Sequence, residues 1–413
     1  SVWLGCNGVI YLTNRVYSPT SYVSVSYPAM INETMHILYW GIKQLQYNVY
    51  LNSLNSYYSF FIPTNNSLLE YIDPVSYGKS QTQLYRFHYD PTQVDENMRV
   101  WASVWNYDTV AGEVTDSIGE VRDPGRIRNR LKDILDTHIV IGNVEDGHKY
   151  YRTKGGMEIR VNNVADGANG MTVEGSYQIN EGNPINVSYI YDQTEGGNGK
   201  AYILDSEPIM GTRQTAYDIL GNTPEFSKFF ELLDGSDLTE TIRNNKNACG
   251  GKNMAMFNTY HYTIYVPTNE SIEELQRAGK LSSWDAVAAH EESGNYEAKT
   301  ADSLGIVNFL KYHIQDNALF IGAAPEKGDF ETAVIDPSTE RFYRVSAELT
   351  ENGINLKDHA GNTRQVITSD ERLYNLMARE YLYNDKDVEN SVNIETSSSA
   401  VIHLIDKPLM IKK

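Results

Sequence analysis

The run Tyr58-Ser-Phe-Phe-Ile-Pro-Thr-Asn-Asn-Ser67 returns later in the chain as Tyr262-Thr-Ile-Tyr-Val-Pro-Thr-Asn-Glu-Ser271. Each copy begins with aromatic and β-branched residues, which favour a strand, and continues with a proline, which cannot donate to a β-ladder. A threonine and an asparagine follow at the position of a helix N-cap, ahead of the helix-compatible runs 68–72 and 272–275. The repeat therefore predicts two copies of one strand–turn–helix unit.

A second repeated phrase lies downstream of each copy and ends in a histidine. The two phrases are Ile127-Arg-Asn-Arg-Leu-Lys-Asp-Ile-Leu-Asp-Thr-His-Ile-Val140 and Ile306-Val-Asn-Phe-Leu-Lys-Tyr-His-Ile-Gln315. Apolar residues at 127, 131, 134 and 135, and again at 306, 309 and 310, fall on one face of a helix. His138 and His313 stand where each predicted helix gives way to extended chain.

A third phrase occurs three times and predicts a strand that follows a tight turn. It reads Asn198-Gly-Lys-Ala-Tyr-Ile-Leu-Asp205, then Ser399-Ala-Val-Ile-His-Leu-Ile-Asp406, and also Asn7-Gly-Val-Ile-Tyr-Leu-Thr-Asn14 near the N-terminus. Asn-Gly before an alternating run is a strong hairpin signal. We therefore expect residues 1–20 to be the last strand of a preceding, mostly missing domain, with an export signal further upstream.

The order of these phrases predicts the domain organisation. Between the second and third phrases each half is turn-rich and alternating, which is typical of a small antiparallel sheet. The predicted domains span 21–212 and 213–413, and the first carries an insertion at about 79–125. That insertion holds the aromatic run Val100-Trp-Ala-Ser-Val-Trp-Asn-Tyr107, which must be buried or bound.

Composition excludes several classes of protein. The 413 residues carry a net charge of −19, and nucleic-acid binding needs clustered Lys and Arg, so nucleic acid is not an expected partner. The two cysteines, Cys6 and Cys249, provide neither a disulfide framework nor zinc-ligand spacing. No run of about 18 apolar residues predicts a membrane span. Neither a metal nor a cofactor is predicted.

The three phrases, in this order, resemble the fasciclin-like domain family. The second half matches best, through Tyr265-Val-Pro-Thr-Asn269 and Leu310-Lys-Tyr-His313. The first half keeps Pro63-Thr-Asn65 but has Thr137 where the family often has tyrosine. The second half departs in its final strand, where Ser399-Ala-Val-Ile-His403 replaces Asn-Gly and tyrosine.

The resemblance implies an α+β fold of two tandem fasciclin-like domains, each a β-wedge packed with several helices. It also implies an extracellular or cell-surface location, and adhesion to protein or glycan partners without catalysis. Bacterial chains of this kind are often lipid-anchored at the outer membrane, some beside glycan or nutrient uptake machinery. Contact with a membrane is therefore expected only through a missing N-terminal lipid anchor.

The candidate contact residues are aromatic or histidine side chains. They are Tyr312, His313, His138, Trp101, Trp105, Tyr107, Tyr260 and Tyr262. The alternative for the histidines is a hydrogen bond that closes the helix end, because a histidine among apolar neighbours is usually a satisfied structural residue. For the aromatic residues of the insertion, the alternative is that they pack an inserted core.

Three functions stay open on the sequence alone. The first is a non-catalytic surface adhesion or scaffold module, in which two domains add avidity. The second is a polysaccharide-binding accessory lipoprotein of an uptake system, which predicts a groove with exposed Trp or Tyr. The third and most remote is a carboxylate-dependent glycoside hydrolase, which predicts two acidic side chains about 5–9.5 Å apart across a cleft.

Overall fold

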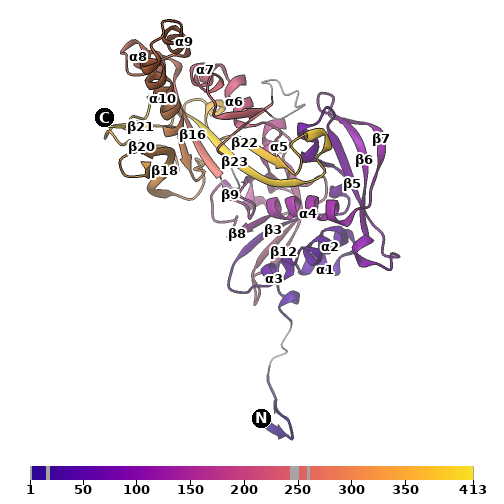
Figure 1. Ribbon diagram of the computed structural model, residues 1–413. Helices are drawn as coiled ribbons and strands as arrows, with labels where there is room; N and C mark the ends of the chain where they lie inside the picture. Colours follow the sequence, from indigo (N-terminus) through magenta and orange to yellow (C-terminus); the bar gives the residue numbers. More distant parts are fainter. Residues whose placement is uncertain (1, 15–18, 242–250, 258–260, 413) are drawn as a thin grey trace.

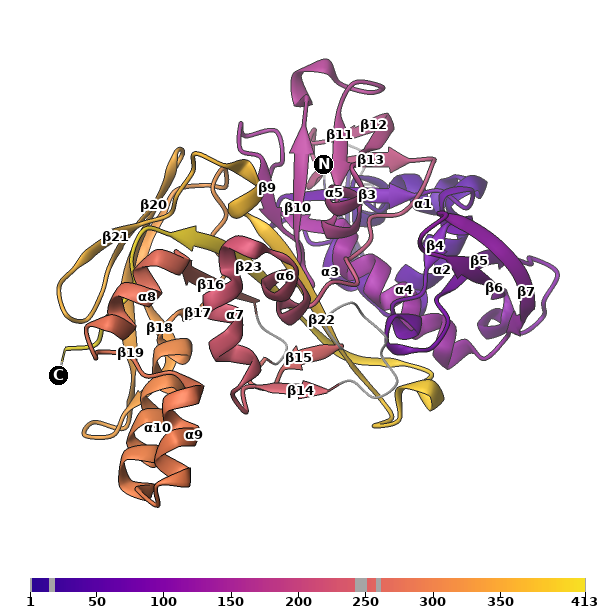
Figure 2. The same cartoon turned by 90° about the horizontal axis from the view of Figure 1, so that it is seen from above.

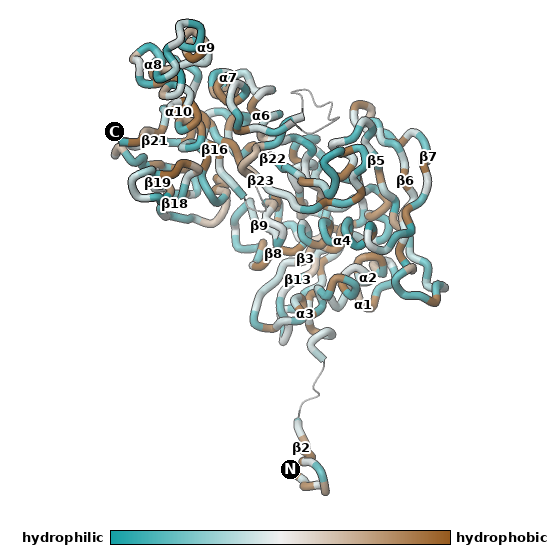
Figure 3. Tube along the Cα trace, in the orientation of Figure 1, coloured by the Kyte–Doolittle hydropathy of each residue, from teal (hydrophilic) through white to brown (hydrophobic). Residues whose placement is uncertain are grey.

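The computed structural model describes residues 2–14, 19–241, 251–257 and 261–412. Two α+β halves lie side by side, and an N-terminal hairpin stands apart from both (Figure 1). Hydrophobic residues alternate with hydrophilic ones along many of the strands, as expected for sheets with one buried face (Figure 3).

The first half is built on a seven-stranded sheet of order β8-β3-β13-β12-β11-β10-β9. Its strands are β3 (Tyr58–Pro63), β8 (Ile139–Ile141), β9 (Tyr150–Arg152), β10 (Glu158–Asn162), β11 (Thr172–Glu174), β12 (Ile185–Gln193) and β13 (Gly199–Leu204). Its helices are α1 (Tyr27–Ile31), α2 (His36–Gln44), α3 (Tyr47–Leu51), α4 (Pro124–His138) and α5 (Ser176–Glu181). Buried residues of α2, α4 and β3 share one hydrophobic core.

The second half is built on an eight-stranded sheet of order β21-β20-β19-β18-β17-β16-β23-β22. Its strands are β16 (His261–Pro267), β17 (Ile314–Asp316), β18 (Glu326–Asp336), β19 (Arg341–Thr350), β20 (Gly353–Lys357), β21 (Thr363–Gln365), β22 (Leu376–Tyr383) and β23 (Ile394–Ile405). Its helices are α6 (Ala216–Asn222), α7 (Ser227–Asp234), α8 (Asn269–Arg277), α9 (Trp284–Glu292) and α10 (Tyr296–Tyr312). Two further strands, β14 (Thr239–Thr241) and β15 (Lys252–Met254), pair in a separate antiparallel sheet.

The two halves repeat one strand arrangement. In the first half β3 pairs with β13 in parallel, with Tyr58 opposite Gly199 and Pro63 opposite Leu204. In the second half β16 pairs with β23 in parallel, with His261 opposite Ser399. In each half the strand after the long helix, β8 or β17, joins the other edge of the first strand in antiparallel fashion. The predicted α+β fold is confirmed.

The segment 71–121 of the first half forms a separate four-stranded sheet of order β4-β5-β6-β7. Its strands are β4 (Tyr71–Ile72), β5 (Gln83–Tyr89), β6 (Val100–Asp108) and β7 (Glu113–Val121). Alternate residues of β5 and β6, among them Phe87 and Ala102, are buried in the core of the first half. Figure 2 shows this sheet at the end of the first half farther from the second half.

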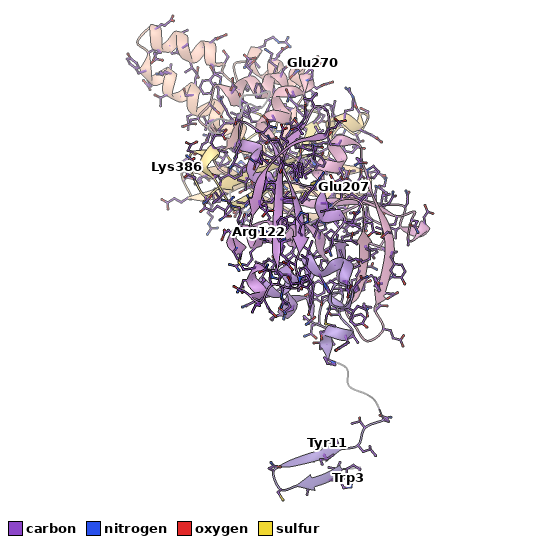
Figure 4. The ribbon with its side chains drawn as sticks, turned by 90° about the vertical axis from the view of Figure 1, so that its right-hand side faces the viewer. Trp3, Tyr11, Arg122, Glu207, Glu270 and Lys386 are labelled. Carbon is purple, nitrogen blue, oxygen red and sulfur yellow. The ribbon has the colours of Figure 1, made fainter. Side chains whose placement is uncertain are left out.

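The N-terminal hairpin pairs β1 (Val2–Gly5) with β2 (Gly8–Tyr11). Trp3 is 50% exposed and Tyr11 is 68% exposed, and both lie away from the body of the molecule (Figure 4). The segment expected to be a single last strand thus contains two strands. Its place in a preceding domain stays a prediction.

Candidate functional site

His138 and His313 occupy equivalent positions at the ends of α4 and α10. A backbone N–H approaches the Nε2 atom of each ring, from Ile209 to His138 and from Leu409 to His313, at 2.9 Å in both cases. A backbone N–H must donate, so Nε2 accepts and Nδ1 carries the proton. Nδ1 then donates to the carbonyl four residues earlier, at 2.6 Å in His138 and 2.7 Å in His313. Each ring therefore ties a helix end to the segment that follows the last strand.

Burial fixes the charge state of these two rings. Both side chains are fully buried, and burial lowers the pKa of His138 to about 3 and that of His313 to about 4. Tyr312 is buried as well; its hydroxyl donates to the carbonyl of Arg344 and accepts the N–H of His359. In this structure the three candidate contacts at the helix ends are not accessible to a partner, because each side chain is buried and its polar atoms are hydrogen-bonded within the protein.

Thr268 caps helix α8 as the sequence predicts, but the first copy has no α-helix at 68–72, where a short 3-10 helix (Ser67–Leu69) leads into strand β4. Thr64 and Thr268 each accept, through Oγ1, a backbone N–H three residues ahead at 3.3 Å. The asparagines do something that the sequence pattern missed. Asn65 Oδ1 accepts the N–H of Ile37 in α2, and Asn269 Oδ1 accepts the N–H of Lys228 in α7. Each asparagine thus fixes the start of an earlier helix to its strand.

The inserted sheet holds Trp101 between two other side chains. The His88 ring stacks on Trp101 with centroids 4.3 Å apart, and the Arg122 guanidinium lies 4.3 Å from the Trp101 centroid. His88 belongs to β5, while Arg122 directly follows β7, and these strands flank β6 on opposite sides. Arg122 is labelled in Figure 4. The two faces of the Trp101 ring are therefore already in contact with protein.

The remaining candidate aromatic residues are half-buried where the structure describes them. Trp105 donates from Nε1 to Ser103 Oγ at 3.2 Å. Tyr107 packs against a small cluster that joins the two halves. Tyr262 stacks on Phe257 with centroids 4.2 Å apart. Tyr260 lies outside the described residues.

The loop between β22 and β23, residues 384–393, extends from the second half onto the first; we call it the arm (Figure 2). Asn129 of α4 binds the start of β23 through two hydrogen bonds: Nδ2 donates to the carbonyl of Ile394 at 2.8 Å, and Oδ1 accepts the N–H of Ile394 at 2.9 Å. Arg130 donates to the carbonyl of Val392 at 2.7 Å. The Tyr383 hydroxyl donates to the carbonyl of Pro74 at 2.9 Å. Helix α4 of the first half is thus joined directly to the second half.

A second set of contacts joins the halves on another side of the junction. Arg152 Nη2 donates to Asn317 Oδ1 at 2.7 Å and to the carbonyl of Ala318 at 3.0 Å. The N–H of Lys149 donates to the carbonyl of Gly322 at 2.7 Å. Two separate anchor regions, the arm and this one, restrict rotation of one half against the other.

A cleft of about 780 Å³ opens beside this second anchor region and takes residues from both halves. Its charged and aromatic lining includes Lys149, Tyr150 and Arg160 from the first half, and Glu351, Glu371 and Tyr374 from the second. A bidentate pair with the buried Glu174 fixes Arg160, at 2.7 and 2.8 Å.

Two tyrosines and a carboxyl group are neighbours in this cleft. Burial raises the pKa of Tyr374, and the nearby Glu371 and Tyr150 raise it further. The Tyr150 ring also packs on Phe320 of the second half, with centroids 5.1 Å apart. The sequence phrases contain none of these residues, because the cleft is assembled from strands and loops that lie far apart along the chain.

Within the described ranges, no group of three or more His, Cys, Asp or Glu side chains is placed to hold a metal ion. Over the same part of the chain, no helix combines the length and the apolar character that crossing a membrane would require.

Comparison with known proteins bears on the second half most directly. Residues 224–411, most of this half, match the model of the fasciclin domain. Among solved structures, the chain is similar to a FAS1 domain pair from the insect cell adhesion molecule fasciclin I. That similarity has a TM-score of 0.29 and 14% identity, over 92% of this chain and 97% of the other. No curated protein matches the chain.

Proposed function

We propose that this pair of fasciclin-like domains is a non-catalytic adhesion or scaffold module of the cell surface that binds a protein or glycan partner. Fasciclin domains are generally adhesion or binding modules of surface or extracellular proteins. The observation that carries the proposal for this chain is its domain junction, where two anchor regions hold the halves together.

A fixed junction matters for binding, because it makes one continuous surface out of two domains. If the halves rotated freely, each encounter with a partner would lose the entropy of orienting the second domain. Ion pairs and hydrogen bonds across the junction, such as Arg379–Asp133 at 3.5 Å with both side chains largely buried, provide that orientation before binding. A partner can then be recognised over a broad face of both halves, and no covalent bond is made or broken.

The polysaccharide-binding accessory role is the second candidate, and the polar cleft between the halves favours it. Attachment by a lipid anchor at a bacterial outer membrane, next to an uptake complex, belongs to this same proposal. Such an anchor would hold the cleft at the cell surface, where it would be accessible to polymeric sugars.

The test uses intact cells that carry the protein. The tagged full chain is bound to these cells, its partners are captured through the tag, and crosslinking identifies what it contacts. We expect the tagged chain to retain one surface protein or glycan. An excess of untagged chain should compete for that partner and reduce the amount retained. A failure to retain any surface component, or release of cleaved sugar from a retained glycan, would contradict a non-catalytic binding module. Sugar release would instead favour the carboxylate-dependent hydrolase.

A further inference from the structure

We infer that the cleft between the two halves is a binding site for a neutral oligosaccharide. The inference rests on the proposed function, since it names the chemistry of one ligand for a surface-binding module. The site needs both halves: Arg160 and Tyr150 come from the first, and Glu371 and Tyr374 from the second.

The size and setting of the cleft suit a small polar ligand. Its volume of about 780 Å³ lies within the usual range of ligand sites, about 300–1,000 Å³. The hydrogen bond from Lys149 N–H to the Gly322 carbonyl and the Tyr150–Phe320 contact hold its two walls together. A ligand therefore meets a site that is already formed, which lowers the entropy cost of binding.

The charges of the cleft disfavour an anionic ligand. Arg160 is already paired with Glu174, so its charge is largely neutralised. Lys149 then remains against the three carboxyl groups of Asp146, Glu351 and Glu371 in the lining. A phosphate, sulfate or uronic acid would face this excess of negative charge.

The hydrogen-bonding groups distinguish a sugar from a cationic peptide. Amides at Asn180 and Asn352 lie in the same lining as the carboxylates and the Arg160 guanidinium. A sugar hydroxyl donates and accepts at once, so it can bond to every one of these groups. A lysine or arginine side chain only donates, so it would leave the N–H donors of Lys149, Asn180 and Asn352 without acceptors.

Two tyrosines complete the chemistry. The rings of Tyr150 and Tyr374 give the cleft apolar faces that can cover the C–H faces of a sugar ring, while their hydroxyls stay polar. Phe320 supports the Tyr150 ring from the second half, so this platform keeps its position. The combination of fixed donors, acceptors and two rings is what a neutral saccharide requires.

The experiment is an array of neutral oligosaccharides probed with the full chain, then titration calorimetry with the best binder. The array also carries sulfated and uronic-acid glycans, and basic peptides are titrated in parallel. We expect a neutral oligosaccharide to bind, and Tyr374→Ala to weaken it by about tenfold or more. Glu371→Gln, at an exposed position, is a second variant with little risk to folding, and it too is expected to weaken binding.

The matched control is Tyr189→Ala, because Tyr189 is 55% exposed on β12 and outside the cleft lining. The affinity of this variant for the neutral oligosaccharide is expected to equal that of the parent chain. Binding of acidic glycans or basic peptides alone would overturn the inference, as would no neutral binder at millimolar concentration, or unchanged affinity in folded Tyr374→Ala and Glu371→Gln. In each of those cases retention of a partner on intact cells would still support the adhesion module, so the two proposals fail separately.

Discussion

Arg130 and Asp73 form a buried bidentate ion pair, with Nε–Oδ1 at 2.7 Å and Nη2–Oδ2 at 3.1 Å. Their side chains are 1% and 2% exposed. The same guanidinium donates through Nη1 to the carbonyl of Val392 in the arm. One buried cation thus links α4, the turn after β4 and the second half of the molecule.

Removal of Asp73 should destabilise the whole chain strongly. In Asp73→Ala, Arg130 remains buried without its counter-charge, and we expect the free energy of unfolding to fall by about 3–5 kcal/mol. Urea unfolding followed by circular dichroism measures this. Glu348→Ala removes the exposed partner of Lys327 and should change stability by less than about 1 kcal/mol. Equal losses in the two variants would contradict a structural role for the buried pair.

The buried histidines should make the chain sensitive to acid. The pKa of His313 is about 4 in the folded protein and about 6.5 when unfolded, so below pH 6.5 the unfolded state binds more protons. The stability that His313 contributes is therefore complete above pH 6.5. It is lost as the pH falls towards 4, by up to about 1.4 kcal/mol per pH unit.

His313→Gln tests this contribution. At neutral pH the variant should be less stable by about 1–3 kcal/mol, because the N–H of Leu409 and the carbonyl of Phe309 lose their buried partner. Between pH 6.5 and 5 its stability should fall less steeply than that of the parent chain. Urea titrations at several pH values give both slopes, and parallel slopes would show that His313 does not titrate on unfolding.

Glu380 should have the opposite pH dependence. Its side chain is buried and accepts the N–H groups of Ala216 and Met254, yet burial raises its pKa to about 8. The folded state therefore holds a proton that the unfolded state releases near pH 4.3. The corresponding stability is present at low pH and is lost as the pH rises through about 8.

Glu380→Gln, which cannot ionise, should gain stability relative to the parent chain between about pH 5 and pH 9. Chemical unfolding at the two pH values measures the difference. The exposed Glu348→Gln is the control and should show no such trend. A constant difference between Glu380→Gln and the parent chain would mean that Glu380 is ionised throughout.

The strand–Pro–Thr–Asn phrases predicted the fold because their information is local. A proline that ends a strand and a threonine that accepts the N–H three residues ahead act within a few residues, and both strands form as predicted at Tyr58–Pro63 and His261–Pro267. The predicted helix forms only after the second copy, because the run 68–72 enters the edge strand β4 of the inserted sheet. The histidines were ambiguous for the opposite reason. Their partners, Ile209 and Leu409, lie far along the chain, so the sequence could not show whether the rings are covered.

The cleft could not be predicted by the same means. Arg160 is on β10 and Tyr374 precedes β22, and neither belongs to a repeated phrase. Their proximity depends on how the two halves dock, which rests on arm contacts such as Arg130 with Val392. Docking of this kind leaves no periodic pattern in a single sequence.

Asn129 should control how tightly the arm is held. Asn129→Ala removes both hydrogen bonds to the backbone of Ile394, and we expect faster hydrogen exchange across residues 384–394 with little change in the core of either half. Hydrogen exchange with mass spectrometry reads this directly. Asn186→Ala, at an exposed position of β12, should leave the arm unchanged. Unaltered exchange in Asn129→Ala would mean that other contacts, such as Tyr383 with Pro74, suffice to hold it.

Trp101 should matter for stability rather than for saccharide binding. Its ring lies between His88 and Arg122, so a sugar could stack on it only by displacing one of them. In Trp101→Ala the loss of the cation–π contact alone should cost about 0.5–1 kcal/mol. The affinity for a neutral oligosaccharide should stay within twofold of that of the parent chain, which is a difference of about 0.4 kcal/mol in binding free energy. Calorimetry on Trp101→Ala beside Tyr374→Ala separates the two positions. If Trp101→Ala abolished binding and Tyr374→Ala did not, the saccharide site would lie on the inserted sheet and the cleft would have another role.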